Sequence, residues 1–438
     1  MRAIFIVLVS LAGIWLSFTR SAIYGLYAYL WFAYIRAQDI TRWVSWLPAL
    51  RLSFALAVSV ILSALIQGEK LFYPHRLSFL ILVLWLCFLV STVFSSVSAV
   101  SWDTFWEMTK VFIMGSLIAG LSINRERFHR ICLVITICLA FYGVKVGIFS
   151  LRGGQIQEGP GGIMQDNNTF AMVLVMTIPF MYYLGHTFKG WMKRGFHYSI
   201  PLVMWGVVGT NSRGGFLALV SLLIIMVLYT GGRLRWFAIG IFLFAIFSWQ
   251  FLPDSYKERI GTIHQTKQAV DSAPTLEEAE GDASALGRIH FWKVAWVMAQ
   301  ENPILGTGLG TYISRYNDYD FSNGFFGRSK AVHNSYMEML SNNGFPAFGI
   351  YITLFLTTFL ENQKIRKEIK AYPSLAWATP YTYMIEMSIL AFLVGSFFLS
   401  VAYADLPYHI VCLVIGLRHV LKNEVGLLSL PYASQRTK

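Results

Sequence analysis

The sequence predicts an all-α polytopic membrane protein of about twelve transmembrane helices. Hydrophobic residues make up 56% of its 438 residues and charged residues only 13%, at a mean hydropathy of +0.54. A soluble domain needs far more polar surface than this. The charged residues also gather between apolar runs of roughly membrane-spanning length, whereas two soluble domains would show them scattered throughout.

The apolar runs are the predicted spans, and several of them are short. They cover residues 3–18, 22–35, 52–66, 77–94, 104–122, 131–149, 168–186, 198–210, 215–230, 236–252, 346–360, 381–401 and 406–420. One long polar stretch, residues 253–333, interrupts them. We therefore expect a transmembrane bundle over 1–252, an outer segment with amphipathic helices over 253–345, and C-terminal transmembrane helices with a cytoplasmic tail over 346–438.

Basic residues predict the orientation. The densest basic cluster follows residue 360, and the positive-inside rule places it in the cytoplasm. Its members are Lys364, Arg366, Lys367 and Lys370. Followed backwards, the alternation places four more basic loops inside: Arg233 and Arg235; Lys189, Lys193 and Arg194; Arg125, Arg127 and Arg130; and Lys70 and Arg76. The formal net charge of +12 therefore reflects topology, and we expect no nucleic-acid partner.

The N-terminal segment obeys the positive-inside rule less well. With Arg20 inside, Arg36, Arg42 and Arg51 lie outside, against the rule. Either the first two short runs form one broken element, or Met1 lies outside. We favour about twelve spans with both termini in the cytoplasm.

Two arginines stand at expected helix starts on the outer side. A glycine-rich turn separates two apolar runs, so Arg213 lies beside a helix N-cap, Asn211 or Ser212. A second helix is expected to open at Gly287-Arg288, with one apolar face. That face comprises Ile289, Trp292, Trp296 and Ala299. Helix N-termini favour anions, so the two arginines form a candidate anion site. The alternatives are an arginine that snorkels to the interface and a plain surface charge.

His333 lies two residues before a third expected helix. Ser335 and Glu338 have capping-box spacing, so a helix is expected to begin at Ser335, stop at Gly344 and be followed by one that starts at Pro346. Neighbouring arginines and a helix N-terminus both lower a histidine pKa, and a neutral imidazole can accept a proton. The alternative is a histidine that orients its neighbours without chemistry.

Two further candidates lie on or near the outer side. Lys145 is expected about two turns below the outer end of its run, where it would neutralise the same anion or pair with a carboxylate such as Asp166. Asp318-Tyr319-Asp320 has the D-x-D pattern that binds a divalent cation beside a sugar phosphate, although such triplets often arise by chance. The arginines offer a metal-free alternative, so we expect no metal ion and no cofactor.

Four short motifs carry a resemblance to a known family. They are Ser212-Arg213-Gly214-Gly215, Gly287-Arg288-Ile289-His290-Phe291-Trp292, Asn302-Pro303-Ile304-Leu305-Gly306-Thr307-Gly308 and His333-Asn334-Ser335-Tyr336. In order, spacing and surrounding hydropathy, residues 170–360 resemble the O-antigen ligase / O-antigen polymerase superfamily. The N-terminal part, with Gly143-Val144-Lys145 and Asp166-Asn167-Asn168, looks like the O-glycosylation ligases associated with the exosortase A system.

The resemblance implies a GT-C glycosyltransferase of the Gram-negative inner membrane, with its site in the periplasm. It implies transfer of an O-antigen glycan from undecaprenyl diphosphate to lipid A-core oligosaccharide, by a metal-independent displacement that inverts the anomeric carbon. The family's two arginines and one histidine carry over to Arg213, Arg288 and His333. Lys145, Asn334 and Tyr336 are expected to bind substrate. A membrane lipid is the expected partner besides the donor and the acceptor.

Other functions stay open at this point. A protein Ser or Thr would be the acceptor of an O-oligosaccharyltransferase, and a glycan repeat that of an O-antigen polymerase. A lipid-linked sugar transporter, which belongs to a different class, would also place cations in a membrane cavity. A transporter alone would need neither the large outer segment nor a histidine set against the arginines.

Overall fold

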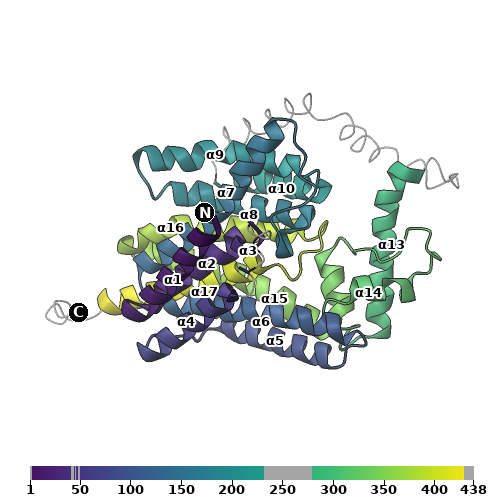
Figure 1. The fold of residues 1–438 in the computed structure, drawn as a ribbon, viewed down its shortest axis with the longest axis horizontal. Helices are drawn as coiled ribbons and strands as arrows, with labels where there is room; N and C mark the ends of the chain where they lie inside the picture. The colour runs from purple at the N-terminus through teal and green to yellow at the C-terminus, as the bar shows by residue number, and fades with distance from the viewer. Residues whose placement is uncertain (1, 41–43, 45, 48–49, 231–278, 429–438) are drawn as a thin grey trace.

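The structure, a computed structural model, describes residues 2–40, 44, 46–47, 50–230 and 279–428. Its regular elements over these residues are helices that pack side by side, and α13 and α14 stand apart at the right in Figure 1. The elements are α1 Arg2–Thr19, α2 Ala22–Ile35, α3 Ala37–Ile40, α4 Leu52–Ile66, α5 Arg76–Val93, α6 Ser98–Leu121, α7 Arg125–Leu151, η2 Gly162–Met164, α8 Asn167–Gly185, α9 Gly190–Gly209, α10 Arg213–Thr230, α13 Ala279–Glu301, α14 Tyr312–Tyr319, α15 Ser335–Ala371, η4 Pro373–Ala378, α16 Thr379–Gly395 and α17 Asp405–Leu428.

Four helices of the described chain are long and apolar enough to cross a membrane, namely α5, α7, α8 and α15. Shorter apolar helices lie in α1, α2, α4 and α10. The class of an all-α membrane protein is therefore confirmed, whereas twelve spans stay a prediction. The predicted span 236–252, the loop with Arg233 and Arg235, and residues 253–278 of the outer segment lie outside the described residues.

Among the described residues, most predicted runs coincide with helices, and one does not. The run 381–401 was expected to be a single span, but α16 ends at Gly395 and residues 396–404 are irregular. Their backbone groups bond to the start of α15: the Ser335 N–H donates to the Ser396 carbonyl oxygen at 2.8 Å, and the Val401 N–H donates to Ser335 Oγ at 2.9 Å. Hydropathy does not reveal this break because the irregular residues are themselves mostly apolar.

The start of α1 and the end of α17 lie at opposite ends of the bundle. The turn between α1 and α2 meets the start of α7, because Arg127 Nη2 donates to Ser21 Oγ at 2.9 Å. The last turns of α17 lie at the same end, since the Asn423 side chain donates to the Ile123 carbonyl at 2.8 Å. α1 therefore starts at the end opposite to that where α17 stops, and the side of the membrane on which each terminus lies stays a prediction.

The helix α15 connects the two ends of the bundle. It has 37 residues, so at 1.5 Å per residue it is roughly 55 Å long. Gly344 adopts φ +75°, ψ 178°, which kinks the helix just before Pro346, as the sequence predicted. The expected boundary between residues 345 and 346 therefore falls inside this helix. We call the end where α15 begins the His333 end, and the other the Arg418 end.

Candidate functional site

Arg213 is the first residue of α10, as the sequence predicted. Ser212 is the cap, because its Oγ accepts the Gly215 N–H at 3.0 Å and donates to Asn168 Oδ1 at 2.7 Å. The next two glycines allow close packing: a Cβ on Gly214 would lie 2.5 Å from Leu399 Cδ2, and one on Gly215 would lie 2.4 Å from Ala171 Cβ. Arg213 is thereby held between α8 and the irregular segment 396–404.

Arg288 lies in the interior of a helix and not at its start. α13 begins at Ala279, so the prediction of a second arginine at a helix N-terminus is wrong. Of the predicted apolar face, Ala299 is buried but Ile289 and Trp296 are exposed, and most of the buried face consists of other residues. Those residues are Phe291, Val294, Ala295 and Met298, which pack against Tyr312, Tyr316 and Val332.

His333 precedes α15 in a left-handed backbone conformation, with φ +51°. Its N–H donates to Ser400 Oγ at 3.0 Å. The helix is capped by Asn334, whose Oδ1 accepts the N–H groups of Tyr336 and Met337 at 3.0 and 3.1 Å. The predicted capping box of Ser335 and Glu338 is therefore wrong, since Ser335 Oγ donates to the Leu399 carbonyl at 2.7 Å instead.

A hydrogen bond joins the helix of Arg288 to the turn of His333. Trp292 Nε1 donates to the Val332 carbonyl oxygen at 3.1 Å, one turn along α13 from Arg288 and one residue before His333. The same helix is fixed from its other side by buried His290, whose Nε2 donates to Asp320 Oδ1 at 2.7 Å. These contacts set the position of Arg288 relative to His333.

The two arginines and the histidine act on one another electrostatically. Burial lowers the pKa of Arg288, and the positive charge of Arg213 lowers it further. Burial also lowers the pKa of His333, as does the charge of Arg288, while Asp166 opposes this shift. Three residues that are far apart in the sequence therefore lie close in space. Two guanidinium groups that repel each other favour the binding of an anion between them.

The imidazole of His333 is accessible at this point. Its ring is half-buried, and among the residues that the structure describes no hydrogen bond to either ring nitrogen is found. With its pKa below the ordinary value, His333 is neutral at pH 7. A neutral, accessible imidazole beside two cations can accept a proton from a bound hydroxyl group.

The residues predicted from the sequence to form the site do not include Asp166. It caps α8, with its carboxylate accepting the Thr169 N–H at 2.8 Å, and its negative charge acts on His333. Nothing in the local sequence distinguishes this role, because an aspartate before a helix is an ordinary N-cap. Only the packing of α8 against α10 and α16 brings it near His333.

The other predicted binding residues have different surroundings. Asn334 is buried and serves as a cap, and the Tyr336 hydroxyl donates to the Leu393 carbonyl at 2.6 Å. Lys145 is exposed and lines an apolar cavity between α7 and α9. None of the contacts or cavities found in the described part of the chain joins Lys145 to Arg213, Arg288 or His333.

The two carboxylates of the D-x-D triplet have separate partners. Asp318 forms an ion pair with Arg315 at 2.9 Å. Asp320 is buried, which raises a carboxyl pKa, but hydrogen bonds from Ser322, Gly324 and His290 lower the pKa of Asp320 to about 2. Asp320 is thus a structural acceptor that fixes the loop after α14 to α13.

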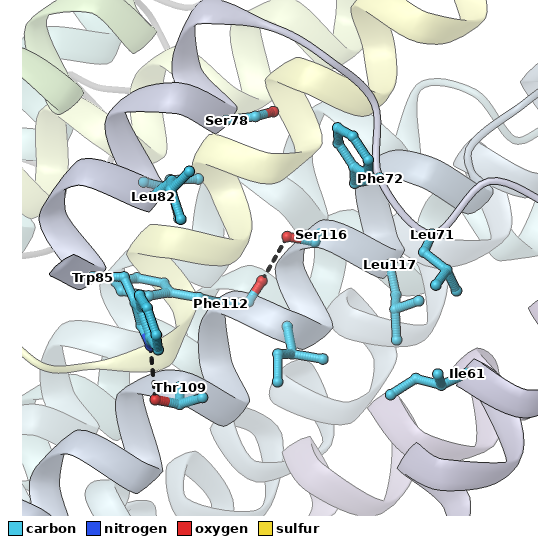
Figure 2. Close-up of a pocket in the computed structure, with 12 residues that line it drawn as sticks. Ile61, Leu71, Phe72, Ser78, Leu82, Trp85, Thr109, Phe112, Ser116 and Leu117 are labelled. Atoms are coloured by element: carbon cyan, nitrogen blue, oxygen red, sulfur yellow. Dashed lines mark hydrogen bonds between the residues drawn. The ribbon is translucent and has the colours of Figure 1, made fainter. Parts of the chain in front are cut away.

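The lateral groove in Figure 2 does not suit an anion. It lies between α4, α5 and α6, has a volume of about 470 Å³ and is lined by no charged residue. Its polar side chains already have partners: Trp85 Nε1 donates to Thr109 Oγ1 at 2.9 Å, and Ser116 Oγ donates to the Phe112 carbonyl at 2.9 Å. This groove is therefore not a candidate for the site that binds the diphosphate.

Fold and site together define an α-helical membrane protein that gathers two arginines and a neutral histidine at one end of its bundle. Residues 199–352, which include all three, match the family described as O-Antigen ligase. This match confirms the resemblance to the O-antigen ligase superfamily and supports an O-antigen ligase or polymerase-like function. Residues 1–188 match a family of unknown function. No curated protein matches the chain.

Proposed function

We propose that the protein transfers a glycan from undecaprenyl diphosphate to an acceptor hydroxyl group, by the GT-C mode of transfer, on the periplasmic side of a Gram-negative inner membrane. The observation that carries the proposal is that Arg213, Arg288 and His333, from three separate elements, lie close enough for the charge of Arg213 to act on Arg288 and that of Arg288 to act on His333. A diphosphate is already a good leaving group, so transfer requires charge stabilisation on the phosphates and a base for the acceptor.

Arg213 and Arg288 suit the first requirement. A guanidinium group contacts phosphate oxygens in a bidentate manner, and two of them neutralise the charge that develops as the glycosyl bond to the phosphate breaks. Arginines that supply this charge make a metal ion unnecessary. We therefore propose metal-independent transfer, with full activity in EDTA. Loss of transfer in EDTA that Mg²⁺ or Mn²⁺ restores would contradict this part of the proposal.

His333 suits the second requirement. The acceptor oxygen forms a bond to the anomeric carbon, the bond from that carbon to the phosphate breaks, and the hydroxyl proton passes to the imidazole. The products are the elongated acceptor and undecaprenyl diphosphate. Because the acceptor attacks from the side opposite to the leaving group, the anomeric configuration inverts.

An apolar groove beside Arg288 supports a lipid-linked donor. It has a volume of about 470 Å³ and lies on the exposed side of α13. Its lining residues are Ile289, Trp292, Lys293, Trp296, Val297, Phe321 and Met337. An isoprenoid chain requires such an apolar surface next to the groups that bind its diphosphate.

The acceptor that we propose is the lipid A-core oligosaccharide. A glycan repeat or a protein Ser or Thr is the acceptor in the alternative reactions. The test uses the purified full-length protein with undecaprenyl-diphosphate-linked glycan and each acceptor in turn. A new covalent product on lipid A-core supports the proposal. If a product forms only on another acceptor, the reaction is reassigned to that acceptor. If the donor crosses the membrane of vesicles and no covalent product forms, the protein is a transporter.

A further inference from the structure

A further cavity lies at the Arg418 end, far from the proposed transfer site. Its volume is about 680 Å³, and it lies where the start of α5 meets the last turns of α15 and α17. The residues that line it are His75, Arg76, Glu361, Lys364, Glu368, Ile369, Tyr372, Leu375, Arg418, Leu421, Lys422 and Val425. Because α15 begins at the His333 end, the kinked helix separates the two sites by most of its length of roughly 55 Å.

Both carboxylates in this cavity already have cationic partners. Glu361 Oε1 accepts from Arg418 Nε at 2.9 Å and from Nη2 at 2.7 Å, and Arg76 pairs with its other oxygen. Glu368 accepts from Arg418 Nη2 at 3.2 Å. His75 Nε2 lies 3.6 Å from Glu361 Oε1. The negative charge of the cavity is therefore fully engaged within the protein.

The positive charge is in excess. Four cationic side chains, Arg76, Lys364, Arg418 and Lys422, face two carboxylates. Lys364 and Lys422 are exposed, and no ion pair to either is found among the described side chains. The Arg76 side chain keeps 54% of its surface exposed although it pairs with buried Glu361. The cavity thus presents three accessible cations that can bind one anion.

Backbone groups add to this charge. The 18-residue helix α5 begins at Arg76, and Arg76 and the cap residue His75 both line the cavity. His75 caps only one of the first N–H groups, that of Leu77, at 3.2 Å. A helix N-terminus carries positive partial charge and binds phosphate oxygens well.

We propose that this cavity binds a phosphate group, namely the head group of an anionic phospholipid in the cytoplasmic leaflet. The apolar part of its wall, formed by Ile369, Leu375, Leu421 and Val425, provides a surface for the glycerol and the upper acyl chains. The positive-inside rule assigns this end to the cytoplasm, where anionic lipids attract basic side chains.

The test is native mass spectrometry of full-length protein in detergent, titrated with dioleoyl phosphatidylglycerol. Dioleoyl phosphatidylcholine has the same chains without net negative charge, and inorganic phosphate has the anion without chains. The double variant Lys364→Gln, Lys422→Gln removes the two unpaired charges and leaves the ion pairs of Glu361 intact. Two lost contacts predict that affinity for the first phosphatidylglycerol falls by about 30-fold.

The matched control is Lys367→Gln, Lys370→Gln. Both lysines are exposed on the same helix, so the net charge changes equally, but neither lines the cavity. The proposal predicts that this control keeps wild-type affinity. An equal loss in both double variants, or none in either, overturns the site. If inorganic phosphate binds as tightly as phosphatidylglycerol, the anion site stands and the assignment to a lipid is overturned.

Discussion

Arginines at the two ends of the bundle have opposite surroundings. At the Arg418 end, Arg418 lies 2.7 Å from Glu361, Arg127 lies 3.0 Å from Glu69, and Arg366 pairs with buried Glu386. At the His333 end, Arg288 has no such carboxylate among the described side chains, and the charge of Arg213 opposes its own. A paired arginine holds helices together. An arginine whose charge is opposed by that of a second arginine favours the binding of an anion.

The largest effect should come from His333→Ala. Loss of a general base typically slows a reaction by about 10²–10⁴-fold, while donor binding stays close to wild type because the base acts on the acceptor. Transfer and donor binding are measured on the same purified protein. Exposed His186, replaced by Ala, is the control and should change neither. A fall in transfer that merely tracks lost donor binding would show that His333 is not the base.

The second-largest effect should be a loss of stability when an ion pair at the Arg418 end is broken. Glu361→Gln removes the buried carboxylate that pairs with both Arg76 and Arg418, and leaves Arg418 only its pair with Glu368. Breaking a buried ion pair in this way costs about 3–5 kcal/mol, so thermal unfolding should occur at a clearly lower temperature. The control is Glu107→Gln, which breaks an exposed pair with Lys110 worth at most about 1 kcal/mol. Similar unfolding temperatures for both variants would remove the contrast between the ends.

Replacement of an arginine at the His333 end should reduce transfer by a smaller factor. Arg213→Lys keeps the charge but not the planar fork, so we expect it to be almost as damaging as Arg213→Ala, with transfer reduced roughly 10- to 100-fold. The same change at Arg288 should have a weaker effect. Arg127→Lys at the other end should leave the transfer rate unchanged. Near-normal transfer by Arg213→Lys would mean that position 213 supplies charge alone.

The smallest effects are shifts of the pH profile. Transfer requires neutral His333, and because its pKa is lowered, activity should persist as the pH falls through the ordinary histidine value and disappear only below it. Asp166 raises this pKa and Lys330 lowers it. Asp166→Asn should therefore shift the acidic side of the pH profile, where activity is lost, to lower pH. Lys330→Gln should shift it to higher pH. If both variants shift the profile in the same direction, or neither shifts it, another group controls the loss of activity at low pH.

Short-range sequence patterns predicted much of the backbone structure at the His333 end. The turn before Arg213, the kink at Gly344 and the start of α15 all follow from short-range chemistry, namely capping side chains, a glycine with positive φ and a proline two residues beyond that glycine. Asn334 replaced Ser335 as the cap because Ser335 is engaged by the segment 396–401. Such a partner lies more than sixty residues away and leaves no local pattern.

Tertiary packing explains the main error. Gly287 indicated a helix start, since glycine costs about 1 kcal/mol inside a helix. In the structure it is buried, a Cβ there would lie at ordinary van der Waals distance from Phe291 and Phe326, and α13 continues through it. The approach of Arg288 to His333 also depends on the bond from Trp292 to Val332, which no spacing rule predicts.

The most direct test of the account is whether the two arginines recognise a diphosphate. Binding of undecaprenyl diphosphate and undecaprenyl monophosphate is measured by native mass spectrometry on wild type and on the double variant Arg213→Ala, Arg288→Ala. Each lost charge-assisted hydrogen bond is worth about 1.5–3 kcal/mol, so wild type should prefer the diphosphate by at least about tenfold and the variant should bind both lipids equally. A double variant that keeps the wild-type preference would contradict the account.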